Sequence, residues 1–308
     1  MAERALIEYI SELASAVRPE WLVLGIGDDC AVIAPPAGSA IVATTDMVVE
    51  GVHFEVGTPP ELVGHKAMAR GVSDVAAMAA RPLCTLAAVS FGAEADEAVG
   101  RRLARALWEA ARAYSAPLVG GDIASGADRL CITVTALGLA GPKGAVTRSG
   151  AQAGDAVCVT GRLGGSILGR HLRFDPRIDA ALSLAAACDL HAMIDISDGL
   201  STDALHIADA SGRGIVLHAD RIPISDDAAA LAVRSGREPL WHALNDGEDY
   251  ELLFCLPPEQ ARDLAPRGVL GLPVTVIGAV QDGPGSFLVT PDGRRTPLRA
   301  GGWEHMVR

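Results

Sequence analysis

The segment MIDISDG at residues 193–199 is an apolar run that ends in aspartates set among small residues. Three earlier segments repeat this pattern: VLGIGDD at 23–29, IVATTD at 41–46 and PLVGGD at 117–122. A short apolar run of this kind indicates a buried strand. A carboxylate at the end of a buried strand is costly unless a positive charge meets it. The repeated pattern therefore predicts strand ends that aim carboxylates at shared cations, and oxygen ligands favour Mg²⁺.

Strand and helix patterns alternate along the chain around these segments. A turn signal at 141–144 separates a first series of elements from a second one. In the first half we predict helices at 3–17, 60–80 and 94–115 and strands near 22–26, 31–34, 40–45, 83–91, 117–121 and 129–140. In the second half we predict helices at 163–172, 176–189, 201–211, 225–235 and from about 258, and strands at 156–160, 192–196, 214–218, 250–256, 273–280 and 286–290. This mixture predicts an α/β (α+β) fold in two domains, 1–145 and 146–308.

The composition is that of a soluble globular protein, with 308 residues, 49% of them hydrophobic and 21% charged. No stretch approaches the ~18 apolar residues of a membrane span. The N-terminus shows no charged segment followed by a long apolar core, so we expect no signal peptide and a cytoplasmic location. The net charge of −12 argues against a nucleic-acid partner, because phosphates require a basic surface.

The cysteines and lysines exclude several kinds of metal and phosphate site. The six cysteines form no Cys-x-x-Cys pair and mostly stand in apolar runs, which argues against a zinc knuckle or a disulfide scaffold and favours a reducing compartment. No P-loop motif occurs, and Lys66 and Lys143 are the only lysines. A phosphate ligand would therefore be held by metal ions, arginines and backbone amides.

Each candidate residue also has a purely structural explanation. Asp74 could pair with Arg70 one turn earlier on a helix, and His53 could be a packed residue beside Phe54. Asp198 and Ser201 could cap the helix that follows them.

A structural explanation is available for some of the remaining acidic residues but not for all of them. The acidic run at 246–251 could be a solvated loop. Asp195 precedes the expected cap within an apolar strand, so capping does not explain it. Taken together, the structural explanations require many independent coincidences of aspartate, glycine and strand end.

These segments resemble the thiamine-monophosphate kinase family, within the aminoimidazole-ribonucleotide-synthetase-like superfamily. The resemblance runs nearly end to end. It is carried by GIGDDCA at 25–31, TTD at 44–46, EGVHF at 50–54, SDVAAM at 73–78, GGD at 120–122, TRSG at 147–150, DISDGL at 195–200 and GEDYEL at 247–252.

The resemblance implies a fold and an activity. The fold is a two-domain synthetase-like one, with an N-terminal mixed sheet that pairs in a homodimer and a C-terminal α/β sandwich domain. The activity is phosphorylation of thiamine monophosphate to thiamine diphosphate, the last step of thiamine diphosphate biosynthesis, with ATP as co-substrate and several Mg²⁺ ions. Neither nucleic acid nor a membrane is an expected partner.

The resemblance also implies roles by motif position. The implied metal ligands are Asp29, Thr44, Thr45, Asp46, Asp74, Asp122, Asp195 and Asp198. The implied ATP contacts are Gly121, Asp122, Arg148 and Ser197, and the implied thiamine-phosphate contacts are His53, Glu248 and Trp303. Among these, Asp122, Arg148, Asp195 and Asp198 are expected to carry catalysis. We expect direct in-line transfer without a general base, because a phosphate monoester with a second pKa of about 6 is already largely ionised.

Two other readings stay open on the sequence. The first is an ATP-dependent synthetase or dehydratase on the same scaffold, such as a purine ribonucleotide, selenophosphate or hydrogenase-maturation enzyme. The expected cysteine tail of a hydrogenase-maturation protein is missing from WEHMVR at 303–308, and the expected N-terminal reactive cysteine of selenophosphate synthesis does not match Cys30. The second is a Mg-nucleotide sensor that binds ATP without turnover.

Overall fold

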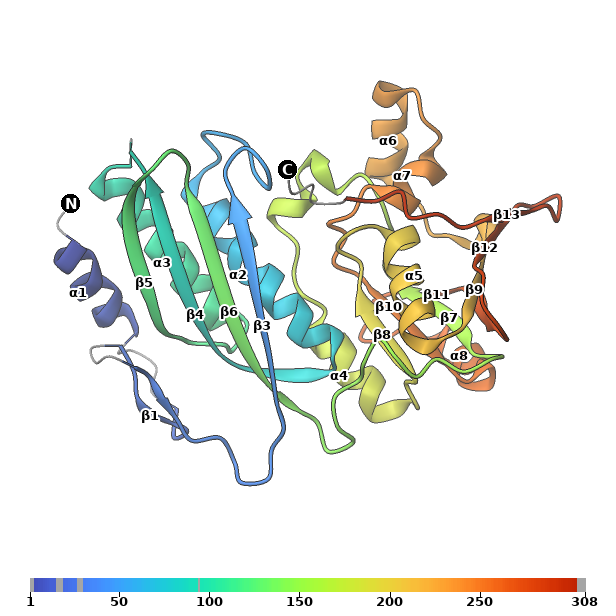
Figure 1. Cartoon of the computed structure of the whole chain (residues 1–308), viewed down its shortest axis with the longest axis horizontal. Helices are drawn as coiled ribbons and strands as arrows, with labels where there is room; N and C mark the ends of the chain where they lie inside the picture. The colour runs from blue at the N-terminus through green and yellow to red at the C-terminus, as the bar shows by residue number, and fades with distance from the viewer. Residues whose placement is uncertain (1–2, 15–18, 27–29, 94, 304–308) are drawn as a thin grey trace. The chain divides into compact units, whose positions relative to one another are not determined.

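The computed structural model describes residues 3–14, 19–26, 30–93 and 95–303 (Figure 1). The chain divides into two compact units. Unit 1 comprises Met1–Val75 and Ala80–Gly144, and unit 2 comprises Ala76–Ala79 and Ala145–Arg308. Among the described residues, no helix combines the length and the apolar character that a membrane crossing requires.

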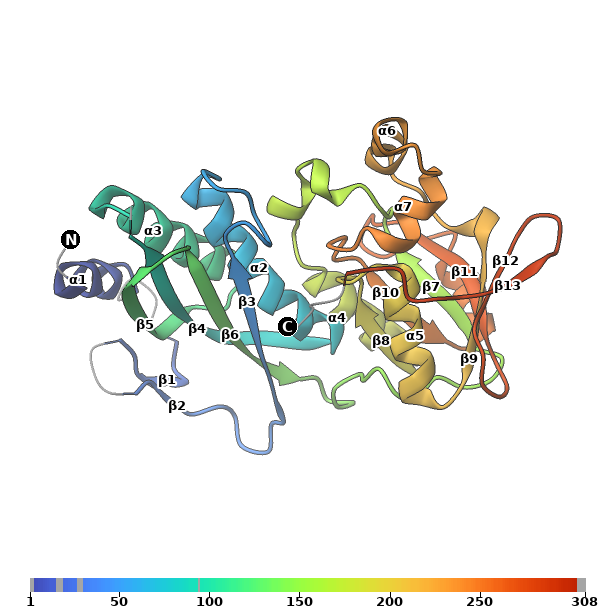
Figure 2. The ribbon, with the colours of Figure 1, turned by 45° about the horizontal axis from the view of Figure 1, so that its top comes forward.

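Unit 1 is built on a four-stranded sheet with one helix-covered face. The strand order is β3 (Ile41–Val49), β6 (Cys131–Ala140), β4 (Ala80–Gly92) and β5 (Leu118–Ala127). Helices α2 (Pro60–Ala77) and α3 (Glu97–Ala113) lie along one face in both views (Figures 1 and 2). Strand β6 shows the two-residue period of a half-covered sheet, since Ile132, Val134 and Ala136 are buried while their neighbours are partly exposed.

The opposite face of this sheet, called here the open face, is largely uncovered. At one end the hairpin of β1 (Leu22–Leu24) and β2 (Val32–Ile33) packs Leu22 with Leu83 and Val119. Helix α1 (Glu3–Ala14) lies near α3 and β5. Along β3, Ile41 and Met47 on the open face are 47% and 49% exposed.

Unit 2 is built on a seven-stranded, mostly antiparallel sheet. The strand order is β13 (Arg295–Pro297), β12 (Phe287–Val289), β9 (Gly214–His218), β11 (Val274–Gln281), β7 (Ala156–Thr160), β10 (Leu252–Leu256) and β8 (Ala192–Asp195).

Helices cover both faces of this sheet, so its central strands are apolar throughout. Val157 and Val159 of β7 face one core, to which α5 (Leu200–Ser211) and α7 (Pro239–Asn245) contribute. Ala156 and Cys158 face the other core, to which α4 (Ile178–Ala187) and α8 (Pro258–Leu264) contribute. Helix α6 (Asp226–Ser235) and the short η3 (Ala219–Arg221) complete the unit. The predicted α/β class is confirmed.

One predicted helix is wrong, and helix α7, strand β13 and the short η3 were not predicted. Instead of a helix at 163–172 the chain forms two single turns, η1 (Ser166–Leu168) and η2 (Arg170–Leu172), because Gly164, Gly165 and Gly169 have positive φ. Helix α7 and strand β13 were missed, since each is short and its packing surface comes from distant residues.

The cysteines behave as small hydrophobic residues, as predicted. Cys84, Cys158, Cys188 and Cys255 are buried, and all six cysteines are free thiols. Burial raises the pKa of Cys84 to about 11 and that of Cys158 to about 12, so neither is a reactive thiolate near neutral pH.

Candidate active site

In unit 1, three of the implied metal ligands gather between β3 and α2. The Thr44 hydroxyl donates a hydrogen bond to the Asp74 carboxylate at 2.5 Å. Asp46, two residues further along β3, accepts from the guanidinium of Arg70 at 3.2 and 3.3 Å. Two carboxylates and a hydroxyl are an oxygen set that suits Mg²⁺, although Arg70 already neutralises part of the Asp46 charge.

Thr45 and Asp122 lie on the open face of the same sheet. Thr45 accepts from the Thr135 hydroxyl across the strand pair at 3.2 Å, so its side chain points away from that of Thr44. Asp122 is in register with Ala88 of β4, an exposed residue between two buried ones. Within unit 1, the implied ligands are therefore divided between the two faces of one sheet.

Asp122 lines a cavity of about 1020 Å³ in unit 1. Its described walls are mostly apolar and include Ala88, Thr133 and Gly121. Strand β5 passes so close to β4 at Gly121 that an added Cβ would lie 2.0 Å from the Ala87 carbonyl oxygen. Only glycine fits this approach, which brings the backbone beside Asp122 to the cavity wall.

His53 is held by its backbone and by one ring nitrogen. The buried Lys66 ammonium donates to the His53 carbonyl at 2.5 Å, and the Val49 N–H donates to His53 Nδ1 at 3.1 Å. An Nδ1 that accepts a hydrogen bond carries no proton, so the ring is neutral and its proton lies on Nε2. His53 thus offers an N–H donor, while Lys66 has a structural role that the sequence did not predict.

In unit 2, the densest group of implied residues surrounds the end of β8. Asp195 is its last residue and is 2% exposed. Ser197, Asp198 and Gly199 form the turn into α5, and each donates its backbone N–H to Asp203 Oδ2 at 3.1 Å. The structural alternative for Asp198 and Ser201 does not hold, because the N-cap of α5 is Gly199 and no side chain makes the capping bond.

Two implied substrate contacts join this turn from distant parts of the chain. The Glu248 N–H donates to the Ser197 carbonyl at 2.7 Å, and the Trp303 N–H donates to the Asp198 carbonyl at 3.2 Å. The Trp303 side chain is 55% exposed. An acidic and an aromatic residue bonded to the same turn suit a cationic ring such as thiazolium.

Arg148 lies on the side of α5. Its carbonyl accepts from the Ser211 hydroxyl at 3.3 Å, and its side chain is exposed. The pKa of His206 is raised, mainly by its contact with Asp203, and the Arg148 charge opposes this increase. A guanidinium at this place is available to an anion.

Asp198, Asp203 and His206 form a group that could hold a cation, since one ligand atom of each lies within 4.8 Å of the others. Asp203 Oδ1 is buried and has no hydrogen-bond partner among the described residues, and His206 Nδ1 is 3.5 Å away. Burial raises the pKa of Asp203. The oxygen donors fit the divalent ion that motif position assigns to Asp198.

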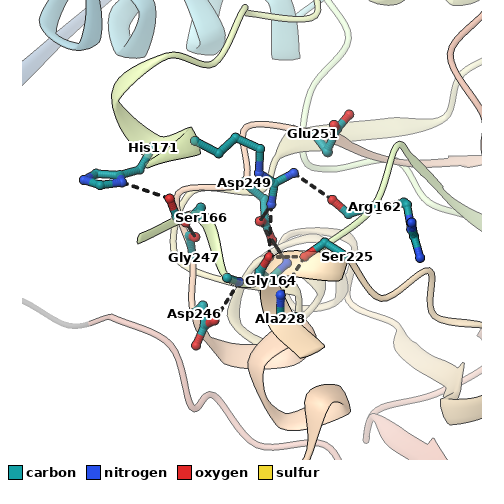
Figure 3. A network of polar contacts seen from close by, with 12 residues as sticks. Arg162, Gly164, Ser166, His171, Ser225, Ala228, Asp246, Gly247, Asp249 and Glu251 are labelled. Carbon is teal, nitrogen blue, oxygen red and sulfur yellow. Dashed lines mark hydrogen bonds and ion pairs between the residues drawn. The ribbon is translucent and has the colours of Figure 1, made fainter. Parts of the chain in front are cut away.

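The acidic run at 246–251 is not a solvated loop. Asp249 accepts from the Gly164 N–H at 2.9 Å and from Arg170 at 2.5 Å, and Asp246 accepts from the Gly165 N–H at 2.8 Å (Figure 3). The glycine-rich loop at 161–166 therefore directs its amides at the chain's own carboxylates, where a phosphate loop would direct them at a ligand.

A second arginine secures the same segment. Arg177 donates to Glu251 at 2.5 and 2.9 Å, and the Thr160 hydroxyl adds a third bond to it at 2.7 Å. Between the anchored acids, Glu248 is partly exposed and has a φ of 52°. Asp249 and Glu251 hold the backbone in this strained turn, and the Glu248 carboxylate accepts a hydrogen bond from the Tyr250 hydroxyl at 3.4 Å.

Sequence reasoning did not single out Asp203, His206, Lys66, Arg170 or Arg177. Arg170 and Arg177 contact acids 79 and 74 residues away, which no local signal reveals. Lys66 stands within the apolar pattern of α2, and Asp203 contacts residues only a few positions away, so these two residues had a local signal. Asp29 lies outside the described residues.

Comparison with known proteins identifies the family. The AIR synthase related protein N-terminal domain matches residues 27–140, and the corresponding C-terminal domain matches residues 134–290. A thiamine-monophosphate kinase from Rhodopirellula baltica is 40% identical over 267 residues, which are 84% of each chain. The chain belongs to the thiamine-monophosphate kinase family. The resemblance inferred from the motifs is thereby confirmed.

Solved structures of this kinase family share the fold. The thiamine-monophosphate kinase from Stenotrophomonas maltophilia K279a is 35% identical with a TM-score of 0.81, covering 96% of this chain and 98% of its own. AaThiL complexed with AMPPCP and TMP is 31% identical with a TM-score of 0.77, covering 99% and 97%. The hydrogenase maturation protein HypE from E. coli reaches a TM-score of 0.80 at 19% identity over 98% and 99% of the two chains, which shows the fold alone.

Proposed function

We propose that this chain transfers the γ-phosphoryl group of ATP to thiamine monophosphate, giving thiamine diphosphate and ADP. The observation that carries the proposal is the cluster at the end of β8. There Asp195, Ser197 and Asp198 lie beside Glu248 and Trp303, which joins the implied metal, ATP and thiamine-phosphate contacts of unit 2 in one place. Membership in the kinase family supports the same activity.

In the proposed reaction a phosphate oxygen of thiamine monophosphate attacks the γ-phosphorus in line, and the bond to the ADP oxygen breaks. Both reactants are anions, so the main tasks are charge neutralisation and alignment. The Arg148 guanidinium supplies a fixed positive fork for the phosphates. His53 donates from Nε2 to the substrate, and Glu248 and Trp303 receive the thiazolium ring.

Mg²⁺ is the proposed metal, because the donors in both units are carboxylate and hydroxyl oxygens. Thr44, Asp46 and Asp74 would hold it in unit 1, and Asp195 and Asp198 in unit 2, with Asp29, Thr45 and Asp122 as further proposed ligands. When bound, the ions neutralise phosphate charge. Ser197, Gly121 and Asp122 are the proposed ATP contacts besides Arg148.

A product assay tests the activity. The purified protein is incubated with ATP and Mg²⁺, with and without thiamine monophosphate, and products are identified by mass spectrometry. We expect ADP and thiamine diphosphate only when both substrates are present. ADP release that needs an amidine-forming or amide substrate would indicate a synthetase, and saturable ATP binding without turnover would indicate a sensor.

A homodimer and a cytoplasmic location complete the proposal. The open face of the unit 1 sheet supports the dimer, because Ile41 and Met47 expose apolar surface on a row of β3 that lacks a covering helix. The six free thiols support a reducing compartment.

A further inference from the structure

We propose that Asp203 is a positioning residue of the kinase site, which fixes the Ser197–Asp198–Gly199 turn from beneath. The inference rests on the proposed function of that turn in binding ATP with its metal. In this role Asp203 touches neither the nucleotide nor the reacting atoms, and Asp198, not Asp203, is the proposed ligand of a cation at the Asp198–Asp203–His206 group.

The backbone of the turn is completely satisfied within the protein. Its three N–H groups all donate to Asp203 Oδ2 at 3.1 Å. Its carbonyls accept from the N–H groups of Glu248, Trp303 and, at Gly199, of Thr202 and Asp203. No N–H group of the turn is left for an anionic ligand, so Ser197 and Asp198 would meet a nucleotide through their side chains.

Three converging amides at the start of a helix form the usual seat of a bound phosphate. Here the Asp203 carboxylate occupies that seat, with its side chain 1% exposed. A phosphate therefore cannot bind these amides. The proposed metal ligand of the turn is the Asp198 carboxylate, and a phosphate can approach a carboxylate only when a cation lies between them. The turn thus favours a metal-complexed nucleotide over a bare phosphate.

Only one oxygen of the Asp203 carboxylate binds the amides of the turn. Oδ2 receives all three N–H groups, whereas Oδ1 has no hydrogen-bond partner among the described residues and lies 3.5 Å from His206 Nδ1. Asparagine could place its single carbonyl oxygen at the Oδ2 position and its amide nitrogen toward His206. Glutamate keeps the negative charge but is longer by one methylene, so its oxygens would be displaced.

The two substitutions therefore separate geometry from charge. We expect Asp203→Asn to bind AMPPCP with Mg²⁺ within about threefold of the unmodified protein, and Asp203→Glu to bind it about tenfold or more weakly, the usual cost of losing a supporting contact behind a ligand residue. Isothermal titration calorimetry measures these affinities. Amide hydrogen exchange of a peptide covering 195–203 measures the turn directly, and we expect protection to survive in Asp203→Asn and to fall in Asp203→Glu.

Asp155 provides the matched control. It is a buried carboxylate that accepts from the Gln152 N–H at 2.7 Å and from His191, and it lies at the opposite end of β8 from the turn. Asp155→Glu should leave both AMPPCP affinity and exchange at 195–203 unchanged.

Several outcomes would overturn the proposal. One is an Asp203→Glu protein that binds AMPPCP normally, and another is an Asp203→Asn protein that binds as weakly as Asp203→Glu while its amides stay protected, since charge would then be the requirement. If Asp203→Glu does not fold, the AMPPCP affinity of Asp203→Asn tests the proposal alone. An affinity within about threefold of the unmodified protein supports the proposal, and a weaker one overturns it. Failure of the unmodified protein to bind AMPPCP would instead refute the proposed function, and the exchange data would still report on the turn.

Discussion

His53 is a neutral donor whose ring orientation is set by its own loop. Because Nδ1 accepts the Val49 N–H, only Nε2 can donate to a ligand. We expect His53→Ala to raise KM for thiamine monophosphate about tenfold, the loss of roughly one hydrogen bond to a charged group, and to leave KM for ATP within about twofold. Steady-state kinetics with each substrate varied measures the difference.

His65 is a suitable control for this substitution. It is a partly buried histidine of unit 1 whose ring contacts Tyr114, 3.3 Å from the hydroxyl. His65→Ala should leave both KM values unchanged. Equal increases in both KM values for His53→Ala would remove the histidine from the thiamine-phosphate site.

The buried acid Asp249 carries a pH dependence of stability. Burial raises its pKa to about 7 against the opposing effects of Arg170 and the Gly164 N–H. The folded state therefore holds a proton that the unfolded chain releases near pH 4, so this contribution to stability is present in acid and is lost as pH rises toward 7. Between pH 5 and 8 the protein should lose about 3 kcal/mol of unfolding free energy relative to Asp249→Asn.

Urea unfolding of both proteins across this pH range measures that difference. Asp282→Asn, which removes the carboxylate of an exposed ion pair with Arg213, controls for the loss of one charge. A constant difference between the unmodified protein and Asp249→Asn would show that Asp249 stays ionised when the protein is folded.

The C-terminal segment 301–303 packs on the start of α5 through glycine. An added Cβ at Gly302 would lie 1.7 Å from the Asp198 carbonyl oxygen and 2.8 Å from the Thr202 hydroxyl. Gly302→Ala must therefore displace the segment and move Trp303 away from the turn. We expect KM for thiamine monophosphate to rise about tenfold, equivalent to about 1.4 kcal/mol, while the thermal midpoint changes little because few other contacts are lost.

Gly92 serves as the control for that substitution, because a Cβ there would meet no atom closer than 3.7 Å. Gly92→Ala should leave the kinetics unchanged. Normal kinetics for Gly302→Ala would mean that the Trp303 segment does not contribute to substrate binding.

For the whole molecule, the open face of the unit 1 sheet is the proposed dimer contact. Met47→Asp would place a charge on this face, and burial of an unpaired charge is strongly unfavourable. We expect a shift from dimer to monomer at micromolar concentration, measured by light scattering after size-exclusion chromatography. Val233→Asp, at an 87% exposed site on α6, should remain dimeric. A Met47→Asp protein that stays dimeric would place the contact elsewhere.

Fold class and family followed from the sequence, because their signals are local. Apolar runs of strand length, their terminal aspartates and the intervening helix patterns each depend on neighbouring residues. The same local reasoning failed at 163–172, where apolar residues and arginines suggested a helix but Gly164, Gly165 and Gly169 take positive φ.

The assignment of individual acids depended on tertiary contacts. The run at 246–251 reads as one acidic loop, yet Asp249 and Glu251 are anchored by Arg170 and Arg177, 79 and 74 residues away, while Glu248 is partly exposed. The physical reason is that the cost of burying a carboxylate is set by the amides and guanidinium groups around it, and the folded backbone brings those groups from distant segments.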